Sequence, residues 1–202
     1  MIISHKHKFI FIKTRKTAGS SVEESLKKYL GPTDVFAAPT GLAKINPDSH
    51  DAHDKHISWK WVADNYPVEW RNYYKFTVDR NPWDKVVSFY FWYAFRKPHK
   101  VKRGFEHYVM SPHIRKCSDW SRYANNKQVQ VDEVIPYEKL HETLSNHAVI
   151  PYNNELLSVR LKGTQRPPGH YSCYYNQETK ARVAEFFTEE IRYFRYRFED
   201  LN

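Results

Sequence analysis

The sequence contains few cysteines and no long apolar run, and each absence excludes a class of protein. Two cysteines, Cys117 and Cys173, give no disulfide framework in a chain of 202 residues, so we expect both to be reduced, structural thiols. The longest apolar stretches, residues 9–12 and 86–95, are far below the roughly 18–20 residues that cross a bilayer. The N-terminal residues lack the apolar segment of a secretory signal. We therefore expect a cytoplasmic protein without membrane contact.

The composition is that of a packed globule that carries excess positive charge. Hydrophobic residues make up 41% of the chain and aromatic residues 16%, and the length fits one domain over residues 1–202. A formal net charge of +9, with eleven histidines besides, favours an anionic partner. Nucleic acid, a polyanionic glycan and a nucleotide with several phosphates all meet that description, and charge alone does not choose among them.

Apolar runs and helical periodicity alternate along the chain. Strand-like segments are followed by segments with helical spacing, which predicts an α/β fold whose sheet is mainly parallel and covered by helices on both faces. Ligands bind beyond the carboxyl ends of the strands in such sheets. The predicted strands are residues 8–13, 35–38, 73–78 and 129–135, and the predicted helices are residues 20–30, 57–65, 82–95, 138–144 and 178–193.

The first strand-to-helix connection has the composition of an anion cradle. Residues 15–21, Arg-Lys-Thr-Ala-Gly-Ser-Ser, combine cations, hydroxyls and the backbone N–H groups of a helix start. The nucleoside-triphosphate loop GxxxxGK[ST] does not match, because no glycine opens the segment and Lys16 precedes Gly19. An ATP or GTP hydrolase is therefore disfavoured. A plain basic turn capped by serine is the structural alternative.

A second motif lies at the end of the strand predicted at residues 73–78. Arg80 ends this strand, Pro82 begins the next helix, and Ser88 follows Arg80 by eight residues, which is roughly two helical turns. A guanidinium fork and a hydroxyl so placed are suited to bracket one phosphate. A capped helix with a surface arginine is the simpler alternative.

Together the two motifs resemble those of the sulfotransferases that use 3′-phosphoadenosine 5′-phosphosulfate (PAPS). The family signatures resemble PKTGGTS and VRNPxDRxxS, where this chain has RKTAGSS and VDRNPWDKVVS. The likeness continues through residues 55–59, 136–140 and 171–175 to the terminal 194–198 segment. It implies a three-layer sandwich similar to the P-loop NTPases. The chain departs from the pattern at Arg15, Ala18 and Asp79.

The resemblance implies roles for particular residues. Lys16 would neutralise charge on the leaving phosphate, and His56 would act as general base toward an acceptor hydroxyl. Arg80 and Ser88 would hold the 3′-phosphate, and Trp83 or Tyr171 is available for the adenine. The implied PAPS-binding residues are Arg15, Lys16, Thr17, Ala18, Gly19, Ser20, Ser21, Arg80, Ser88, Lys162 and Tyr171.

The general base has competing candidates. Asp51, Asp54 or Glu138 is also able to take the acceptor's proton. His50, His53 and His56 recur at every third residue, so a metal cluster is a further alternative. We expect no metal in the reaction.

The acceptor and the function class remain open in the sequence. The basic stretch 96–103 suits an anionic glycan, and a carbohydrate is the expected acceptor, although a small molecule also fits. One competing function is a nucleic-acid-binding module, because aromatic and basic residues interleave over residues 95–127, although we expect no nucleic-acid partner. Another is a nucleotide kinase with a degenerate loop, for which Asp79 is the candidate Mg²⁺ ligand. A scaffold without turnover is disfavoured by intact Lys16, Arg80 and Ser88.

Overall fold

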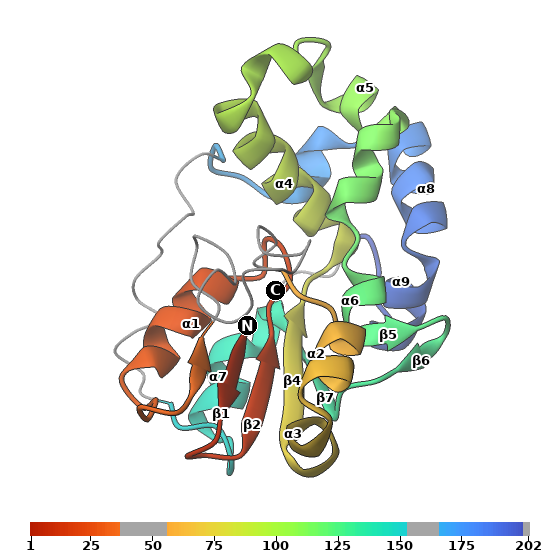
Figure 1. Cartoon of the computed structure of the whole chain (residues 1–202). Helices are drawn as coiled ribbons and strands as arrows, with labels where there is room; N and C mark the ends of the chain where they lie inside the picture. Colours follow the sequence, from red (N-terminus) through yellow and green to blue (C-terminus); the bar gives the residue numbers. More distant parts are fainter. Residues whose placement is uncertain (37–55, 153–165, 200–202) are drawn as a thin grey trace.

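The computed structural model describes residues 1–36, 56–152 and 166–199. Within these residues, five strands form the main sheet in the order β3-β1-β2-β4-β7 (Figure 1). Their bounds are β1 Ile2–Ser4, β2 Phe9–Ile12, β3 Val35–Phe36, β4 Tyr74–Asp79 and β7 Glu133–Pro136. β2, β4 and β7 run parallel, whereas β1 is antiparallel to both β2 and β3.

The expectation of a mainly parallel sheet is therefore wrong, because the sheet is mixed. β1 ends at Ser4 and β2 begins at Phe9, so the two strands form a hairpin. A parallel pair would need a crossover of about a dozen or more residues, which this connection cannot supply. The central strands β2 and β4 are nonetheless parallel, and their carboxyl ends point to the same edge.

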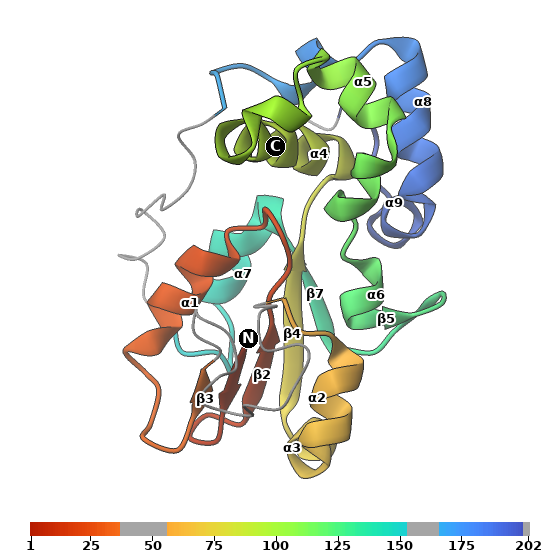
Figure 2. The ribbon, with the colours of Figure 1, turned by 45° about the horizontal axis from the view of Figure 1, so that its top comes forward.

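Helices cover both faces of the sheet, as the α/β prediction required (Figure 2). Successive residues of β2 point to opposite faces: Phe9 and Phe11 join one hydrophobic cluster, and Ile10 and Ile12 join another. The first cluster is closed by α1 Gly19–Lys27 and α7 Leu140–Ser145. The second includes residues of α2 Trp59–Asn65, α3 Pro67–Asn72, α6 Trp120–Tyr123 and the hairpin of β5 Ala124–Asn125 and β6 Gln128–Val129.

A helical layer lies beyond the carboxyl edge of the sheet (Figures 1 and 2). It has its own hydrophobic cluster, in which Val86, Tyr93, Tyr108 and Phe187 are among the buried side chains. Its elements are α4 Pro82–Arg96, η1 Pro98–Lys100, α5 Gly104–Met110, η2 Pro112–Cys117, η5 Tyr171–Tyr174, α8 Gln177–Phe186 and α9 Thr188–Phe194. α4 continues directly from β4, so this layer is tied to the edge where the two motifs lie.

Most predicted elements are confirmed, and two need correction. The predicted strand 129–135 is divided between β6 and β7, and the predicted helix 178–193 is broken at Phe187 into α8 and α9. The predicted helix 138–144 begins with the short turn η3 Tyr137–Lys139 and continues as α7. Strand 35–38 is confirmed at Val35–Phe36, and its remaining residues lie outside the described ones.

Two further expectations concerned the state of the cysteines and the presence of membrane-spanning segments. Cys117 and Cys173 are both free thiols, and Cys117 is buried against the Tyr108 hydroxyl. In the part of the chain that the structure describes, we find no helix with the length and apolar character needed to cross a bilayer.

Candidate active site

The loop that joins β2 to α1, residues 13–18, is anchored to the neighbouring strand. The hydroxyls of Thr14 and Thr17 are buried and lie 2.8 Å apart. Thr14 also donates to the carbonyl oxygen of Val78 near the end of β4. The β2–α1 loop is thereby fixed across the carboxyl edge of the parallel strands, where ligands of α/β sheets bind.

Two residues of the β2–α1 loop adopt left-handed backbone conformations. Lys16 has φ 60° and Ala18 has φ 57°, and neither is a glycine. Such conformations cost about 1–3 kcal/mol each and persist where surrounding contacts enforce them. Ala18 immediately precedes α1, so the first N–H groups of this helix open toward the loop. Loop and helix start lie together where the sequence predicts an anion cradle.

Two hydrogen bonds hold the backbone on either side of Lys16. The Arg15 N–H donates to Oδ2 of Asp119 at 2.8 Å, and Nη1 of Arg80 donates to the Lys16 carbonyl oxygen at 3.2 Å. Asp119 precedes α6 and Arg80 follows β4, so separate parts of the fold enforce the strained turn. Asp119 was not identified from the sequence, because nothing there pairs it with residue 15.

Gly19 is required by close packing beneath the β2–α1 loop. A Cβ atom at this position would lie 2.8 Å from Cγ of Lys13, closer than real side chains approach. Lys13 itself is buried and paired with Glu23 on α1, so it has little room to move away. The backbone of the helix start therefore lies directly on the Lys13 side chain.

Arg80 belongs to a cluster of two arginines on one carboxylate. Its Nε donates to Oδ2 of Asp84 at 2.8 Å, and its guanidinium stacks 4.3 Å from the centre of the Tyr137 ring. Arg166 donates to the other oxygen of Asp84. Arg166 was not identified in the sequence analysis, and the predicted Lys162 lies outside the described residues.

One stripe of α4 faces the same region. Asp84, Ser88 and Trp92 are spaced four residues apart, so they lie on one side of the helix. Asp84 contacts Arg80, and the ring of Trp92 lies 5.8 Å from Nζ of Lys16. This spacing places Ser88 between the two contacts. The structure therefore brings Lys16, Arg80 and Ser88 together around one region.

His56 lies beside the β2–α1 loop, although it is distant in sequence. Its Nδ1 is 3.2 Å from the carbonyl oxygen of Lys13, and a carbonyl accepts only from a protonated nitrogen. Burial lowers the pKa of His56 to about 4, so the ring is neutral at neutral pH with its basic lone pair on Nε2. This is the protonation state that a general base requires.

A buried network of charges adjoins the β2–α1 loop. Nζ of Lys85 lies 2.7 Å from Asp79 and 3.0 Å from Asp119, and Tyr123 donates to Asp79 at 2.6 Å. Burial opposes the charge on Lys85, but Asp119 and Asp79 raise its pKa above the ordinary value. Asp119 also accepts from Arg15. Two departures from the family pattern, Arg15 and Asp79, are thus linked through Asp119 and Lys85.

Glu190 of α9 lies at the margin of this network. It is 4% exposed and accepts a hydrogen bond from Ser118 at 3.1 Å. Burial, with the negative charge of Asp79, raises the pKa of Glu190 to about 7. The native protein therefore retains a proton on Glu190 at pH values where the unfolded chain has released it.

Several candidates occupy structural positions instead. Tyr171 and Trp83 are buried in the helical layer: the Tyr171 hydroxyl donates to Phe198, and the Trp83 indole donates to the Lys180 carbonyl at 3.1 Å. In these positions neither ring offers a face to an adenine. Both oxygens of Glu138 accept hydrogen bonds, from the Asn81 N–H and the Tyr196 hydroxyl. The alternatives His50, Asp51, His53 and Asp54 lie outside the described residues.

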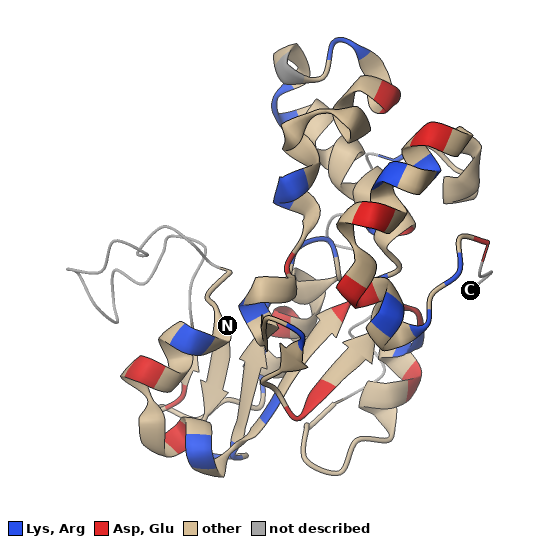
Figure 3. Cartoon of the chain, turned by 90° about the vertical axis from the view of Figure 1, so that its right-hand side faces the viewer, with Lys and Arg blue, Asp and Glu red and all other residues tan. Residues whose placement is uncertain are grey.

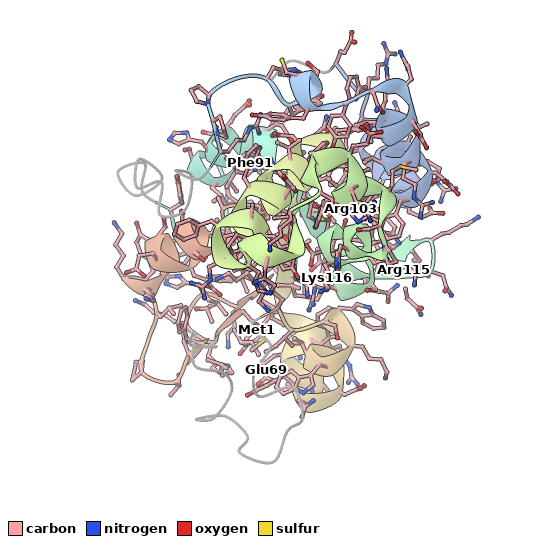
Figure 4. The ribbon with its side chains drawn as sticks, turned by 90° about the horizontal axis from the view of Figure 1, so that it is seen from above. Met1, Glu69, Phe91, Arg103, Arg115 and Lys116 are labelled. Carbon is pink, nitrogen blue, oxygen red and sulfur yellow. The ribbon has the colours of Figure 1, made fainter. Side chains whose placement is uncertain are left out.

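Exposed basic residues lie on the helical layer, and those of η2 lie next to the β2–α1 loop. Arg115 and Lys116 of η2 lie beside each other, with Arg103 on the neighbouring turn (Figure 4). Arg15 Nη1 is 3.4 Å from the Lys116 carbonyl oxygen, so η2 borders the β2–α1 loop directly. In Figure 3, Lys and Arg segments lie on both the helical layer and the sheet layer, interspersed with Asp and Glu. Over residues 1–36, 56–152 and 166–199, no three His, Cys, Asp or Glu side chains gather as metal ligands.

Comparison with known proteins identifies one family. The sequence model described as the sulfotransferase family matches residues 1–197, which is nearly the whole chain. No curated protein and no solved structure matches the chain. The match includes the β2–α1 loop, the turn after β4 and the helical layer.

Proposed function

The chain belongs to the sulfotransferase family, and from this premise we propose that it transfers a sulfuryl group from PAPS to a hydroxyl or amine of an acceptor, most readily a carbohydrate. The fold we assign to it is the P-loop-like variant of the α/β sandwich. The observation that carries the proposal is the β2–α1 loop. There Lys16 is fixed in a left-handed turn at the start of α1, between the Asp119 and Arg80 hydrogen bonds.

The β2–α1 loop and the α1 start suit the 5′-phosphosulfate of the donor. Residues 16–21 supply backbone N–H groups, the hydroxyls of Ser20 and Ser21, and the charge of Lys16. Arg15 is oriented toward Asp119 and Lys116, so its guanidinium borders the site. Arg80 and Ser88 lie where a 3′-phosphate would be held, and Arg166 adds a second guanidinium there.

The proposed reaction is an in-line displacement at sulfur. The bond between the sulfur and the 5′-phosphate oxygen breaks as a bond forms between the sulfur and the acceptor oxygen. Negative charge develops on the leaving phosphate, where a fixed ammonium lowers the energy of the transition state, and Lys16 is that group. The acceptor's proton passes to Nε2 of His56, which burial keeps unprotonated at neutral pH.

Exposed cations beside the site support an anionic acceptor. Arg103, Arg115 and Lys116 are exposed, and η2 touches the β2–α1 loop through Arg15. A carbohydrate that carries sulfate or carboxylate groups would meet these cations while its hydroxyl reaches the sulfur. The competing kinase function is less well supported, because its candidate Mg²⁺ ligand, Asp79, is 1% exposed and paired with Lys85 and Tyr123.

Thermal stabilisation by the product, 3′-phosphoadenosine 5′-phosphate (PAP), tests the proposal. A ligand at one hundred times its Kd adds about 2.7 kcal/mol to stability, which is several degrees in Tm for a chain of this size. We expect that shift with PAP, and a much smaller one with ATP or AMP. Lys16→Ala should abolish sulfuryl transfer, and Arg80→Ala should mainly weaken PAP binding.

Lys60→Ala is the matched control, because Lys60 forms an exposed pair with Asp64 far from the loop. It should behave as the unchanged protein does in both measurements. A shift by ATP equal to that by PAP would favour the kinase. Binding of nucleic acid that weakens steeply as the salt concentration rises, with no thermal shift from PAP, would favour the nucleic-acid-binding module.

A further inference from the structure

We propose that Asp119 is a positioning residue for catalysis: its carboxylate holds the backbone at Arg15 so that Lys16 is kept in its left-handed conformation. The proposal rests on the proposed function, because Lys16 is taken as the cation that contacts the donor. Asp119 does not need to touch the donor. It acts on the residue that precedes Lys16.

The contacts of Asp119 are directed at the β2–α1 loop. Its side chain is fully buried, and Oδ2 accepts from the Arg15 N–H at 2.8 Å while Oδ1 accepts from the Arg15 guanidinium at 3.3 Å. Lys85 lies 3.0 Å from Oδ2 and Arg122 lies 2.9 Å from Oδ1. Two cations thus neutralise the carboxylate and fix its orientation, and both of its oxygens face Arg15.

The position of this contact explains why it affects Lys16. Arg80 binds the carbonyl side of Lys16, and Asp119 binds the peptide one residue before it. A non-glycine residue with φ 60° relaxes toward the right-handed region unless both sides are held. Removal of the Asp119 contact releases the backbone on the Arg15 side of this turn, so the Lys16 side chain loses its fixed direction while Arg80 and Ser88 stay in place.

The experiment compares Asp119→Asn with Asp132→Asn. Asparagine keeps the size of the side chain but has one acceptor oxygen, so it cannot accept from the Arg15 N–H and from the Arg15 guanidinium at the same time. Asp132 is the matched control, because it also accepts a backbone N–H, from Lys75 at 2.7 Å, and pairs with the Lys75 ammonium, but on an exposed turn away from the loop. Binding of two nucleotides, PAP and 3′-AMP, is measured by calorimetry. 3′-AMP lacks the 5′-phosphate that the loop would hold.

We expect Asp119→Asn to weaken PAP binding by about tenfold or more, because Lys16 would no longer be held toward the 5′-phosphate. Losing a hydrogen bond to a charged group usually has an effect of this size. Binding of 3′-AMP should stay within about threefold of that of the unchanged protein, because the 3′-phosphate site is untouched. Asp132→Asn should change neither. If Asp119→Asn weakened the binding of PAP and of 3′-AMP equally, or left PAP binding unchanged, the positioning role would be overturned.

Hydrogen exchange of the Arg15 amide separates this proposal from the proposed function. In the unchanged protein this amide should exchange as slowly as the amides of β2, even if the protein binds neither nucleotide and the sulfotransferase proposal fails. Fast exchange would overturn the role of Asp119 whatever the protein binds. Should Asp119→Asn not fold, the exchange rate of the Arg15 amide in the unchanged protein still decides whether Asp119 holds the backbone there.

Discussion

Replacing Lys85 by methionine should be one of the most destabilising single changes in the chain. Lys85 is 1% exposed and pairs with Asp79, 1% exposed, and with Asp119, which is fully buried. After the change Asp119 keeps Arg15 and Arg122, whereas Asp79 loses the Lys85 ammonium and keeps two neutral donors, the Tyr123 hydroxyl and the Arg80 N–H. Removing one partner of a buried pair costs about 3–5 kcal/mol, because it leaves a buried charge uncompensated.

A second substitution should recover part of the stability that Lys85→Met loses. Adding Asp79→Asn to Lys85→Met removes the stranded charge and leaves an oxygen for Tyr123. The double variant should therefore be less stable than the unchanged protein by about 1–2 kcal/mol, and more stable than Lys85→Met alone. Urea unfolding followed by tryptophan fluorescence measures all three. In a thermal scan, the loss in Lys85→Met should lower Tm by about 6–20 °C.

Lys60→Met provides the control, because Lys60 and Asp64 form an exposed ion pair within α2, four residues apart. Exposed pairs of this kind contribute about 0.2–1 kcal/mol. If Lys85→Met cost no more than Lys60→Met, the buried network would have no energetic importance. If the double variant were no more stable than Lys85→Met alone, the charge of Asp79 would not be what Lys85 compensates.

Other outcomes follow from packing and from the two shifted pKa values. Gly19→Ala should destabilise the protein by about 1–3 kcal/mol in the same urea titration, because its Cβ would overlap Lys13. Gly31→Ala is the control: its Cβ would lie at ordinary contact distance, so the stability should change by less than about 0.5 kcal/mol. The pKa of Glu190 is raised from 4.5 to about 7, so its contribution to stability falls as pH rises through that window. Between pH 4.5 and 7.5, the free energy of unfolding of Glu190→Gln should therefore rise relative to that of the unchanged protein by about 3 kcal/mol. The pKa of His56 is lowered from 6.5 to about 4, so its contribution to stability falls as pH decreases through that window. Below pH 6.5, the free energy of unfolding of His56→Asn should therefore rise relative to that of the unchanged protein. Parallel stability curves across this range for either variant would contradict its shift.

The sequence was sufficient where local composition and chain order determine structure. The runs at residues 8–13 and 73–78 predict β2 and β4, because continuous apolar residues require burial on both faces, as in a parallel pair. The two motifs follow these strands, so topology alone brings them to one edge. The helix break at Phe187 could not be predicted, because apolar residues of α8 and α9 pack on the same hydrophobic cluster and neither glycine nor proline marks the junction.

The candidate site was predicted in part. The β2–α1 loop, Arg80 and His56 were identified from the sequence, and the structure brings them together at one edge of the sheet. Asp119 was missed because its partner Arg15 is 104 residues away, and no local pattern reveals a contact of that range. Tyr171 and Trp83 were chosen as aromatic rings, but the sequence does not show that their polar atoms are bonded inside the helical layer.

The linked pairs in the buried network constrain how this sequence is able to diverge. Arg15 depends on Asp119, Asp119 and Asp79 share Lys85, and each substitution made alone leaves a buried charge or a lost hydrogen bond. A proline at residue 15 or an apolar residue at 79 would therefore be penalised in this chain. We expect these positions to have changed as a group in its ancestry. Ancestral intermediates rebuilt one substitution at a time would pass through less stable proteins, with the fitness effect of each step set by the order of the others.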